Sequence, residues 1–242
     1  MRNGYEWNHT GFWSFIHSLF REIISGLKRV IITGGTGGLG RAIAAAFGTS
    51  GWEVVQLGRN DLDLSNRDKV EDYFLAKPCN LLICAAGAID DVPLLRMLEC
   101  AWDTVYALNY EAAKCCAVAA MPQMVDKSSG HIVFISSQAA IHPAIGQAAY
   151  AASKAALLGL TSTLAESWGK KGIRVNAVLP GFLDTQMTAS VSDTRRGRVK
   201  DEHHLGRFNT PEAAAEFILF LEERMPHTSG QVFQLDSRRG FF

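Results

Sequence analysis

The chain has 242 residues, of which 48% are apolar and 20% are charged, a balance typical of a globular domain with a sizeable core. Lysine plus arginine number 24, as do aspartate plus glutamate, so the net charge is zero and the basic footprint of a nucleic-acid-binding protein is missing. No run reaches the ~18 apolar residues that a membrane span requires. Arg21 and Glu22 interrupt the N-terminal apolar stretch, which therefore does not resemble a signal peptide.

The five cysteines show neither a CxxC pair nor the spacing of a zinc site. An odd number of cysteines without a disulfide framework fits reduced thiols. We therefore expect a cytoplasmic protein without a membrane span, a metal site or a nucleic-acid partner.

Residues 1–27 precede the first predicted strand and form an extension. Apolar side chains recur there at helical spacing, which predicts an amphipathic helix with an aromatic face. Two interpretations stay open: the helix packs on its own domain or a neighbouring subunit, or it lies on a membrane surface. The second is disfavoured because the polar face is not rich in lysine or arginine. The apolar face consists of Phe12, Phe15, Ile16, Leu19, Phe20, Ile23 and Leu27.

A glycine-rich turn follows the first predicted strand. Residues 30–32 are a short β-branched run, residues 33–40 read TGGTGGLG, residues 41–47 favour helix, and residues 53–57 predict a second strand. In a strand–loop–helix–strand unit, such a loop lets the backbone approach a pyrophosphate at the helix N-terminus. The pattern indicates a dinucleotide site, although a plain turn remains the alternative.

Arg59 follows the second strand, where an NAD-binding protein usually has an acidic residue that bonds the ribose hydroxyls. A guanidinium suits a ribose 2′-phosphate. The sequence therefore favours NADP(H), with NAD(H) possible, and the alternative is that Arg59 is only a solvated cation.

Further strands are predicted at residues 80–84, 131–136, 173–179 and 231–235. Residues 94–124 predict two helices with Asn109 inside, either as a structural clamp or as the holder of a water. Residues 182–208 predict a long polar loop of the kind that often serves function. Thr210 and Pro211 predict the start of a last helix. The alternation predicts an α/β fold: one domain at 28–242 with a doubly wound parallel sheet of six to seven strands, preceded by the 1–27 extension.

Tyr150 and Lys154 are four residues apart in an alanine-rich run that favours helix, so they are expected on one face. An ammonium beside a phenol lowers the pKa of the phenol, which makes Tyr150 a candidate acid or base. Ser137, at the end of a predicted strand, could hold a carbonyl oxygen. A packed ring beside a solvated ammonium is the alternative.

Together these segments resemble the short-chain dehydrogenase/reductase family over roughly residues 28–237. The glycine loop matches TGxxxGxG, CAAG at 84–87 resembles the family's NNAG element, and IRVNAVLPGFLDT resembles the segment after the fifth strand. Asn109, Ser137, Tyr150 and Lys154 fall where the family's catalytic tetrad falls. The resemblance implies a Rossmann-type fold and hydride transfer between a nicotinamide cofactor and a carbonyl.

The resemblance also implies individual roles. Ser137 would hold the substrate oxygen, Tyr150 would donate the proton, Lys154 would bond the nicotinamide ribose, and Asn109 would position a water. Residues 186–206 would cover the substrate. The implied cofactor-binding residues are Gly34, Thr36, Gly38, Leu39, Gly40, Arg59, Asp63, Leu64, Ala86, Gly87, Tyr150, Lys154, Pro180, Gly181, Leu183 and Thr185.

The segments DDVPLLRM at 90–97, LGRFNTPEAAAEF at 205–217 and SGQVFQLD at 229–236 resemble the 3-oxoacyl-[acyl-carrier-protein] reductases within the family. This resemblance implies a small carbonyl or acyl thioester substrate and a role in fatty acid biosynthesis. It also implies an acyl carrier protein as a partner and a homo-oligomer, dimer or tetramer. Alcohol, sugar or hydroxysteroid dehydrogenases share the motifs, and a non-catalytic dinucleotide-binding regulator is the alternative of another class. Three departures stand out. The helix after the second strand looks nearly absent, Gly37 replaces a basic residue of the glycine loop, and the carrier-docking loop at 127–129 is only partly basic.

Overall fold

The computed structural model describes residues 28–239. The predicted amphipathic helix of residues 1–27 and the last residues, 240–242, lie outside this range. Among the residues that are described, no helix is both long and apolar enough to cross a bilayer.

Six parallel strands form one sheet in the order β2-β1-β3-β4-β5-β6. This confirms the Rossmann-type fold and the predicted strand number. The order reverses direction at the β1–β3 pair, so the loops after β1 and β3 diverge above the sheet and leave a crevice there. The strands are β1 Arg29–Thr33, β2 Glu53–Leu57, β3 Leu81–Cys84, β4 Gly130–Ile135, β5 Ile173–Leu179 and β6 Val232–Gln234.

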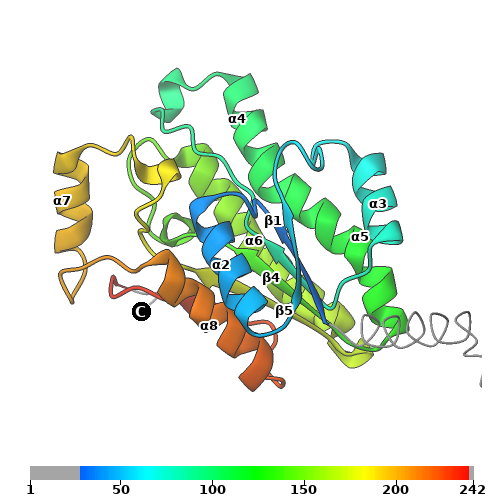
Figure 1. Cartoon of the computed structure of the whole chain (residues 1–242). Coiled ribbons are helices and arrows are strands. Elements are labelled where there is room, and N and C mark those ends of the chain that lie inside the picture. The colour runs from blue at the N-terminus through cyan, green and yellow to red at the C-terminus, as the bar shows by residue number, and fades with distance from the viewer. Residues whose placement is uncertain (1–27, 240–242) are drawn as a thin grey trace, which may run out of the picture.

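Helices cover both faces of the sheet, as Figure 1 shows. α2 (Gly38–Thr49) and α8 (Pro211–Arg224) pack on one face, and α3 (Arg67–Ala76), α5 (Ala112–Asp126) and α6 (Ala148–Trp168) pack on the other. Each face has its own apolar core, and successive residues of a strand alternate between the two. In β1, Val30 and Ile32 belong to one core and Ile31 to the other, and all three are fully buried. Burial on both sides explains the continuous apolar runs in the sequence.

A helix lies between β2 and β3, so the expectation that it would be nearly absent is wrong. Residues 58–66 contain neither helix nor strand, and α3 begins at Arg67. Asn66 caps α3, because its side-chain oxygen accepts a hydrogen bond from the Lys69 backbone N–H at 3.1 Å. Val70 and Phe74, one turn apart, are buried against the sheet. The turns and α3 together carry the chain from β2 past β1 to β3.

One long helical segment replaces the two helices predicted for residues 94–124. A 3₁₀ turn (Leu94–Arg96) precedes α4 (Glu99–Tyr106), and α4 continues through a π-helical turn (Ala107–Glu111) into α5 without a break. A π turn inserts one residue and rotates the side chains that follow. Asn109 lies in this turn and is 1% exposed, so the irregularity brings a polar side chain to the interior.

The predicted long loop is partly helical. It contains a 3₁₀ turn (Gln186–Thr188) and α7 (Asp193–Asp201). The Ser192 side chain caps α7 by accepting a hydrogen bond from the Arg195 backbone N–H at 3.4 Å. Figure 1 shows α7 standing apart from the sheet, beside the C-terminal end of the described chain. The segment predicted to be a loop therefore contains regular secondary structure, including the helix α7.

Candidate active site

A cleft of about 1580 Å³ opens above the carboxyl ends of the strands, at the place where the strand order reverses. It is lined by every residue predicted to bind a cofactor and by three of the four predicted catalytic residues. The fourth, Asn109, lies behind the wall. Segments far apart in the sequence meet here because parallel strands place all their carboxyl ends at one edge.

The glycine loop after β1 lies against the loop after β3. Gly34 has a φ of +67°, and a Cβ there would be 2.7 Å from the Ala86 Cα. A Cβ on Gly38 would be 2.7 Å from the Thr185 Cγ2, and one on Gly40 would be 2.3 Å from the Gly34 carbonyl oxygen. Only glycine fits at these positions, since each would otherwise force backbone or packed side chains apart.

α2 begins at Gly38 without a side-chain cap, so its first backbone N–H groups are open to a ligand. The bare backbone and the uncapped helix together form a cradle for a pyrophosphate. The residues present therefore fit a dinucleotide cofactor.

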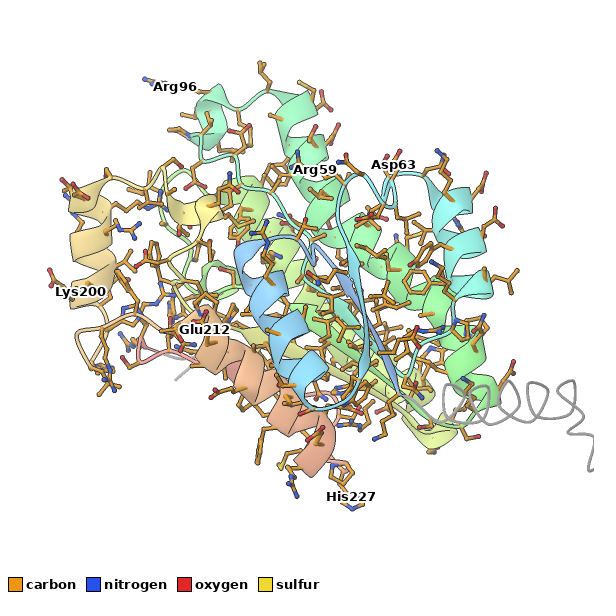
Figure 2. All side chains as sticks on the ribbon, viewed as in Figure 1. Arg59, Asp63, Arg96, Lys200, Glu212 and His227 are labelled. Atoms are coloured by element: carbon orange, nitrogen blue, oxygen red, sulfur yellow. The ribbon has the colours of Figure 1, made fainter. Side chains whose placement is uncertain are left out.

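Arg59 and Asp63 lie on the loop that follows β2, at the edge of the cleft (Figure 2). Both are exposed. Two hydrogen bonds from Ser65 to the Asp63 carboxylate, at 3.0 Å from the backbone N–H and 2.6 Å from Oγ, lower the pKa of Asp63. Asp61 accepts a hydrogen bond from the Gly58 backbone N–H at 2.8 Å, which shapes the turn that carries Arg59.

Ser137 and Tyr150 meet in the cleft through a side-chain hydrogen bond. Ser137 follows β4, and its Oγ also accepts a hydrogen bond from the Ala139 backbone N–H at 3.2 Å. Tyr150 lies in the first turn of α6. The two hydroxyls are therefore held at one point by a strand end and a helix start, as a shared hydrogen-bonding position for a carbonyl oxygen requires.

The pKa of Tyr150 is raised above its ordinary value of 10.0, so the expectation that it would be lowered is wrong for this structure. Burial of the ring raises it most, the hydrogen bond with Ser137 opposes that effect, and the negative charge of Asp91 raises it further. The Lys154 Nζ lies 5.8 Å from the centroid of the Tyr150 ring and donates its hydrogen bond to the Ile135 carbonyl oxygen at 2.8 Å. Desolvation therefore outweighs the ammonium, and Tyr150 is a neutral phenol at neutral pH.

Lys154 lies one turn after Tyr150 on α6 and is only 4% exposed. Burial lowers its pKa from the ordinary 10.5 to about 8. A Cβ on Gly87 would be 3.5 Å from the Lys154 Nζ and 3.0 Å from the Asn109 Oδ1. The ammonium and the amide therefore face the same short stretch of backbone at the floor of the cleft.

The buried ammonium should make the stability of the protein depend on pH. Between about pH 8 and 10.5 the unfolded chain binds a proton at Lys154 that the folded chain has released, so stability rises with pH over this window. The free energy of unfolding of the wild type, relative to Lys154→Met, should rise by on the order of 3 kcal/mol across it. Urea unfolding at a series of pH values measures this difference. Lys170→Met, at an exposed lysine, is the control, and a pH-independent difference for Lys154→Met would contradict the prediction.

Asn109 joins the π turn to the segment after β3. Its Oδ1 accepts a hydrogen bond from the Ala88 backbone N–H at 2.8 Å, and its Nδ2 donates to the Ala88 carbonyl oxygen and to the Ser153 Oγ, each at 3.0 Å. These are the contacts of a structural clamp. All three hydrogen bonds of the Asn109 side chain are made to protein atoms. The predicted water-holding role stays a prediction.

Sequence reasoning missed several residues that line the cleft. Gln138, directly after Ser137, is 4% exposed and donates a hydrogen bond from Nε2 to the Arg239 carbonyl oxygen at 2.7 Å. The sequence signal for this part of the cleft was the pair of consecutive arginines, Arg238 and Arg239, near the C-terminus. The missed lining residues include Asp90, Asp91, Leu108, Gln138, Gln147, Phe182, Arg238 and Arg239, whereas Arg195 and Arg198 lie within residues 186–206, which were expected to cover the substrate.

Solved structures and curated proteins resemble the chain over most of its length. A protein described as an NAD(P) dependent gluconate 5-dehydrogenase, from Beutenbergia cavernae with NADP bound at low occupancy, matches with a TM-score of 0.84 and 29% identity, over 87% of this chain and 95% of that one. An oxidoreductase of the short-chain dehydrogenase/reductase family from Burkholderia thailandensis, at 24% identity and a TM-score of 0.80, covers 87% of this chain and 92% of that one and supports the fold. The 3-oxoacyl-[acyl-carrier-protein] reductase FabG of Thermotoga maritima is 32% identical over 236 residues, which cover 86% of this chain and 96% of that protein.

FabG of Chlamydia muridarum is 33% identical over 237 residues, 86% of this chain and 96% of that protein. The family model for short chain dehydrogenases matches residues 62–196. This match, the relatives and the cleft at the strand ends agree with one another. The chain therefore belongs to the short-chain dehydrogenase/reductase family of oxidoreductases.

Proposed function

We propose that this protein reduces a carbonyl group to an alcohol with a nicotinamide cofactor, through Asn109, Ser137, Tyr150 and Lys154. The observation that carries the proposal is the hydrogen bond between the Ser137 and Tyr150 hydroxyls in the cleft, with the buried Lys154 one helical turn further on. Three such groups beside a dinucleotide cradle have the arrangement that proton transfer to a carbonyl oxygen needs.

In this proposal the substrate oxygen accepts hydrogen bonds from both hydroxyls. Ser137 holds the oxygen, and Tyr150 donates its proton as negative charge develops there. The raised pKa of Tyr150 suits this direction, because a general acid must carry its proton before the reaction.

Lys154 bonds the nicotinamide ribose and, as an ammonium, favours the phenolate that Tyr150 becomes after donating its proton. Asn109 holds the backbone at Ala88 and positions a water that returns protons from solvent. The bound cofactor supplies the hydride.

We propose NADP(H) as the preferred cofactor, with NAD(H) as the alternative. Support comes from Arg59 at the edge of the cleft, in a position where an acidic residue would favour NAD. The segment between Leu57 and Arg67 contains neither helix nor strand, so no helix of that segment stands between Arg59 and the cleft.

We propose a 3-oxoacyl thioester as the substrate, in a fatty acid biosynthesis role, with an acyl carrier protein as a partner and a homo-oligomer as the working form. The names of the curated relatives support this choice. A secondary alcohol or sugar dehydrogenase is the second candidate, favoured by the similarity to the protein described as a gluconate 5-dehydrogenase. A non-catalytic dinucleotide-binding regulator is the third.

A panel of substrates separates these functions. We expect NADPH-dependent reduction of acetoacetyl thioesters to exceed NADP-dependent oxidation of gluconate and simple secondary alcohols, followed by absorbance of the reduced nicotinamide. Faster alcohol oxidation would favour the dehydrogenase. NADPH binding without turnover of any member would favour the regulator and would contradict the proposed reaction.

A further inference from the structure

Four arginines line the cleft on the side away from Arg59. Arg195 and Arg198 belong to α7, and Arg238 and Arg239 follow β6. The two segments adjoin, because the backbone N–H of residue 204 donates to the carbonyl oxygen of residue 237 at 3.0 Å and that of residue 205 donates to its Oγ at 3.2 Å. The arginines therefore lie on neighbouring walls of one cavity.

Arg238 is held in place by a buried carboxylate. The Asp236 side chain is 0% exposed, and its Oδ2 lies 2.7 Å from both the Nε and the Nη2 of Arg238. Gln234 donates from Nε2 to the Asp236 Oδ1 at 2.8 Å. The Arg238 side chain lines the cleft and is 14% exposed, and within residues 28–239 its Nη1 has no partner. One arm of a fixed guanidinium is thus left for a ligand.

The other arginines differ in their partners. Arg195 forms an ion pair with Asp91 at 2.8 Å, which ties α7 to the segment after β3. Within the described part of the chain, Arg198 and Arg239 form no ion pair. Asp90 and Glu202 also line the cleft, but neither pairs with these two arginines. Two exposed guanidinium groups therefore flank the fixed one.

The arginine segment is anchored beside the proposed reaction site. The carbonyl oxygen of Arg239 accepts the hydrogen bond of Gln138, the neighbour of Ser137 in the chain. A Cβ on Gly181 would lie 2.7 Å from the Asp236 Cβ, so the segment also packs against the loop after β5. A molecule whose carbonyl lies at Ser137 would extend toward the arginines.

We propose that Arg238, with Arg198 and Arg239 at the rim, binds an oxyanion of the substrate, a carboxylate or a phosphate. The substrate is then an anionic carbonyl compound. A guanidinium presents N–H groups in a planar fork that matches either oxyanion, and holding Arg238 on Asp236 lowers the entropy lost on binding. This inference rests on the proposed reductase function.

Two matched pairs of substrates test the charge. One pair is 4-oxopentanoate and its methyl ester, which differ by a carboxylate. The other is acetoacetyl-4′-phosphopantetheine and acetoacetyl-pantetheine, which differ by one phosphate. In one of the two pairs, we expect kcat/KM for the charged member to exceed that for the neutral member by about tenfold. This is the effect of one charge-assisted hydrogen bond. The pair that shows the preference identifies the oxyanion.

Variants then assign the preference to the arginines. Arg238→Lys keeps a cation on the buried Asp236 but loses the free arm, and Arg239→Gln removes an exposed charge. Each should reduce the preference about tenfold and leave the neutral substrates unaffected. Lys200→Gln is the control, because Lys200 lies on α7 outside the cleft and Figure 2 shows it on the outer side of that helix.

The outcomes separate the two proposals. Equal rates for charged and neutral members, unaffected by either arginine variant, would overturn the oxyanion site and leave the reductase intact. NADPH binding, measured by fluorescence, should not change in the variants. A loss of NADPH affinity equal to the loss of preference would assign the arginines to the cofactor and overturn the proposal. No reduction of any member would contradict the reductase function and the oxyanion proposal with it.

Discussion

Replacing Tyr150 with phenylalanine is expected to lower kcat for carbonyl reduction by roughly 10²–10⁴-fold, the contribution of a positioned general acid. The change removes one oxygen from a side chain whose pKa is raised by burial and which is hydrogen-bonded to Ser137. Without that hydroxyl, no neutral phenol is available to protonate the oxygen of the substrate. The ring itself remains, so the wall of the cleft keeps its shape, and NADPH binding should stay nearly unchanged.

Tyr73→Phe is the matched control, since Tyr73 lies on α3, packs against the apolar core and does not line the cleft. Steady-state kinetics give kcat, and NADPH fluorescence gives the dissociation constant. A Tyr150→Phe enzyme that turns over at the wild-type rate would defeat the assignment of the whole tetrad. Loss of both turnover and NADPH binding would instead indicate a structural role for the hydroxyl.

Replacing Arg59 with aspartate is expected to shift cofactor choice from NADPH toward NADH. A charge-assisted hydrogen bond to the 2′-phosphate is worth enough to change affinity by roughly 10- to 100-fold, and the introduced carboxylate repels the phosphate while it can accept hydrogen bonds from the ribose hydroxyls. The ratio of kcat/KM for NADPH to that for NADH measures the effect. Arg59 is exposed, so the substitution should not disturb the core.

Arg96→Asp serves as the control for Arg59→Asp. Arg96 is exposed, lies outside the cleft and is shown in Figure 2 at the end of the molecule that carries α4. The Arg96→Asp substitution makes the same change of charge at a position outside the cleft. Its ratio of kcat/KM for NADPH to that for NADH should therefore equal the wild-type ratio. An unchanged ratio in Arg59→Asp would mean that another group recognises the cofactor, and the NADP preference would have to be assigned anew.

Local patterns in the sequence were sufficient to predict the strands of the sheet and the glycine loop after β1. The central strands β1, β3, β4 and β5 are largely apolar runs because both faces of the sheet are buried there. The glycines of the first loop are needed wherever a Cβ would meet backbone, as at Gly34 and Gly40. The helical period was enough to place Tyr150 and Lys154 on one face of α6. These features depend on neighbours in the chain.

The short helix α3 and the π turn at Asn109 were not predicted, for a common reason. α3 has a weak apolar pattern and is held by two buried residues, Val70 and Phe74, so its stability comes from packing on the sheet. The π turn carries Asn109, which exchanges two hydrogen bonds with the Ala88 backbone, 21 residues away in the sequence. Packing on the sheet and a contact between residues 21 positions apart cannot be recognised from a short stretch of sequence.

What the amino-acid order alone determined is the fold, the family and a set of residues that line the cleft. The tertiary structure decided the electrostatics. The pKa of Tyr150 rises rather than falls because the ring is desolvated while Lys154 bonds a backbone carbonyl. It also decided that Arg238 and Arg239 reach the cleft, because a buried carboxylate and Gln138 fix the C-terminal segment beside Ser137. Desolvation of one particular hydroxyl and contacts between distant segments set such properties, and a local sequence pattern specifies neither.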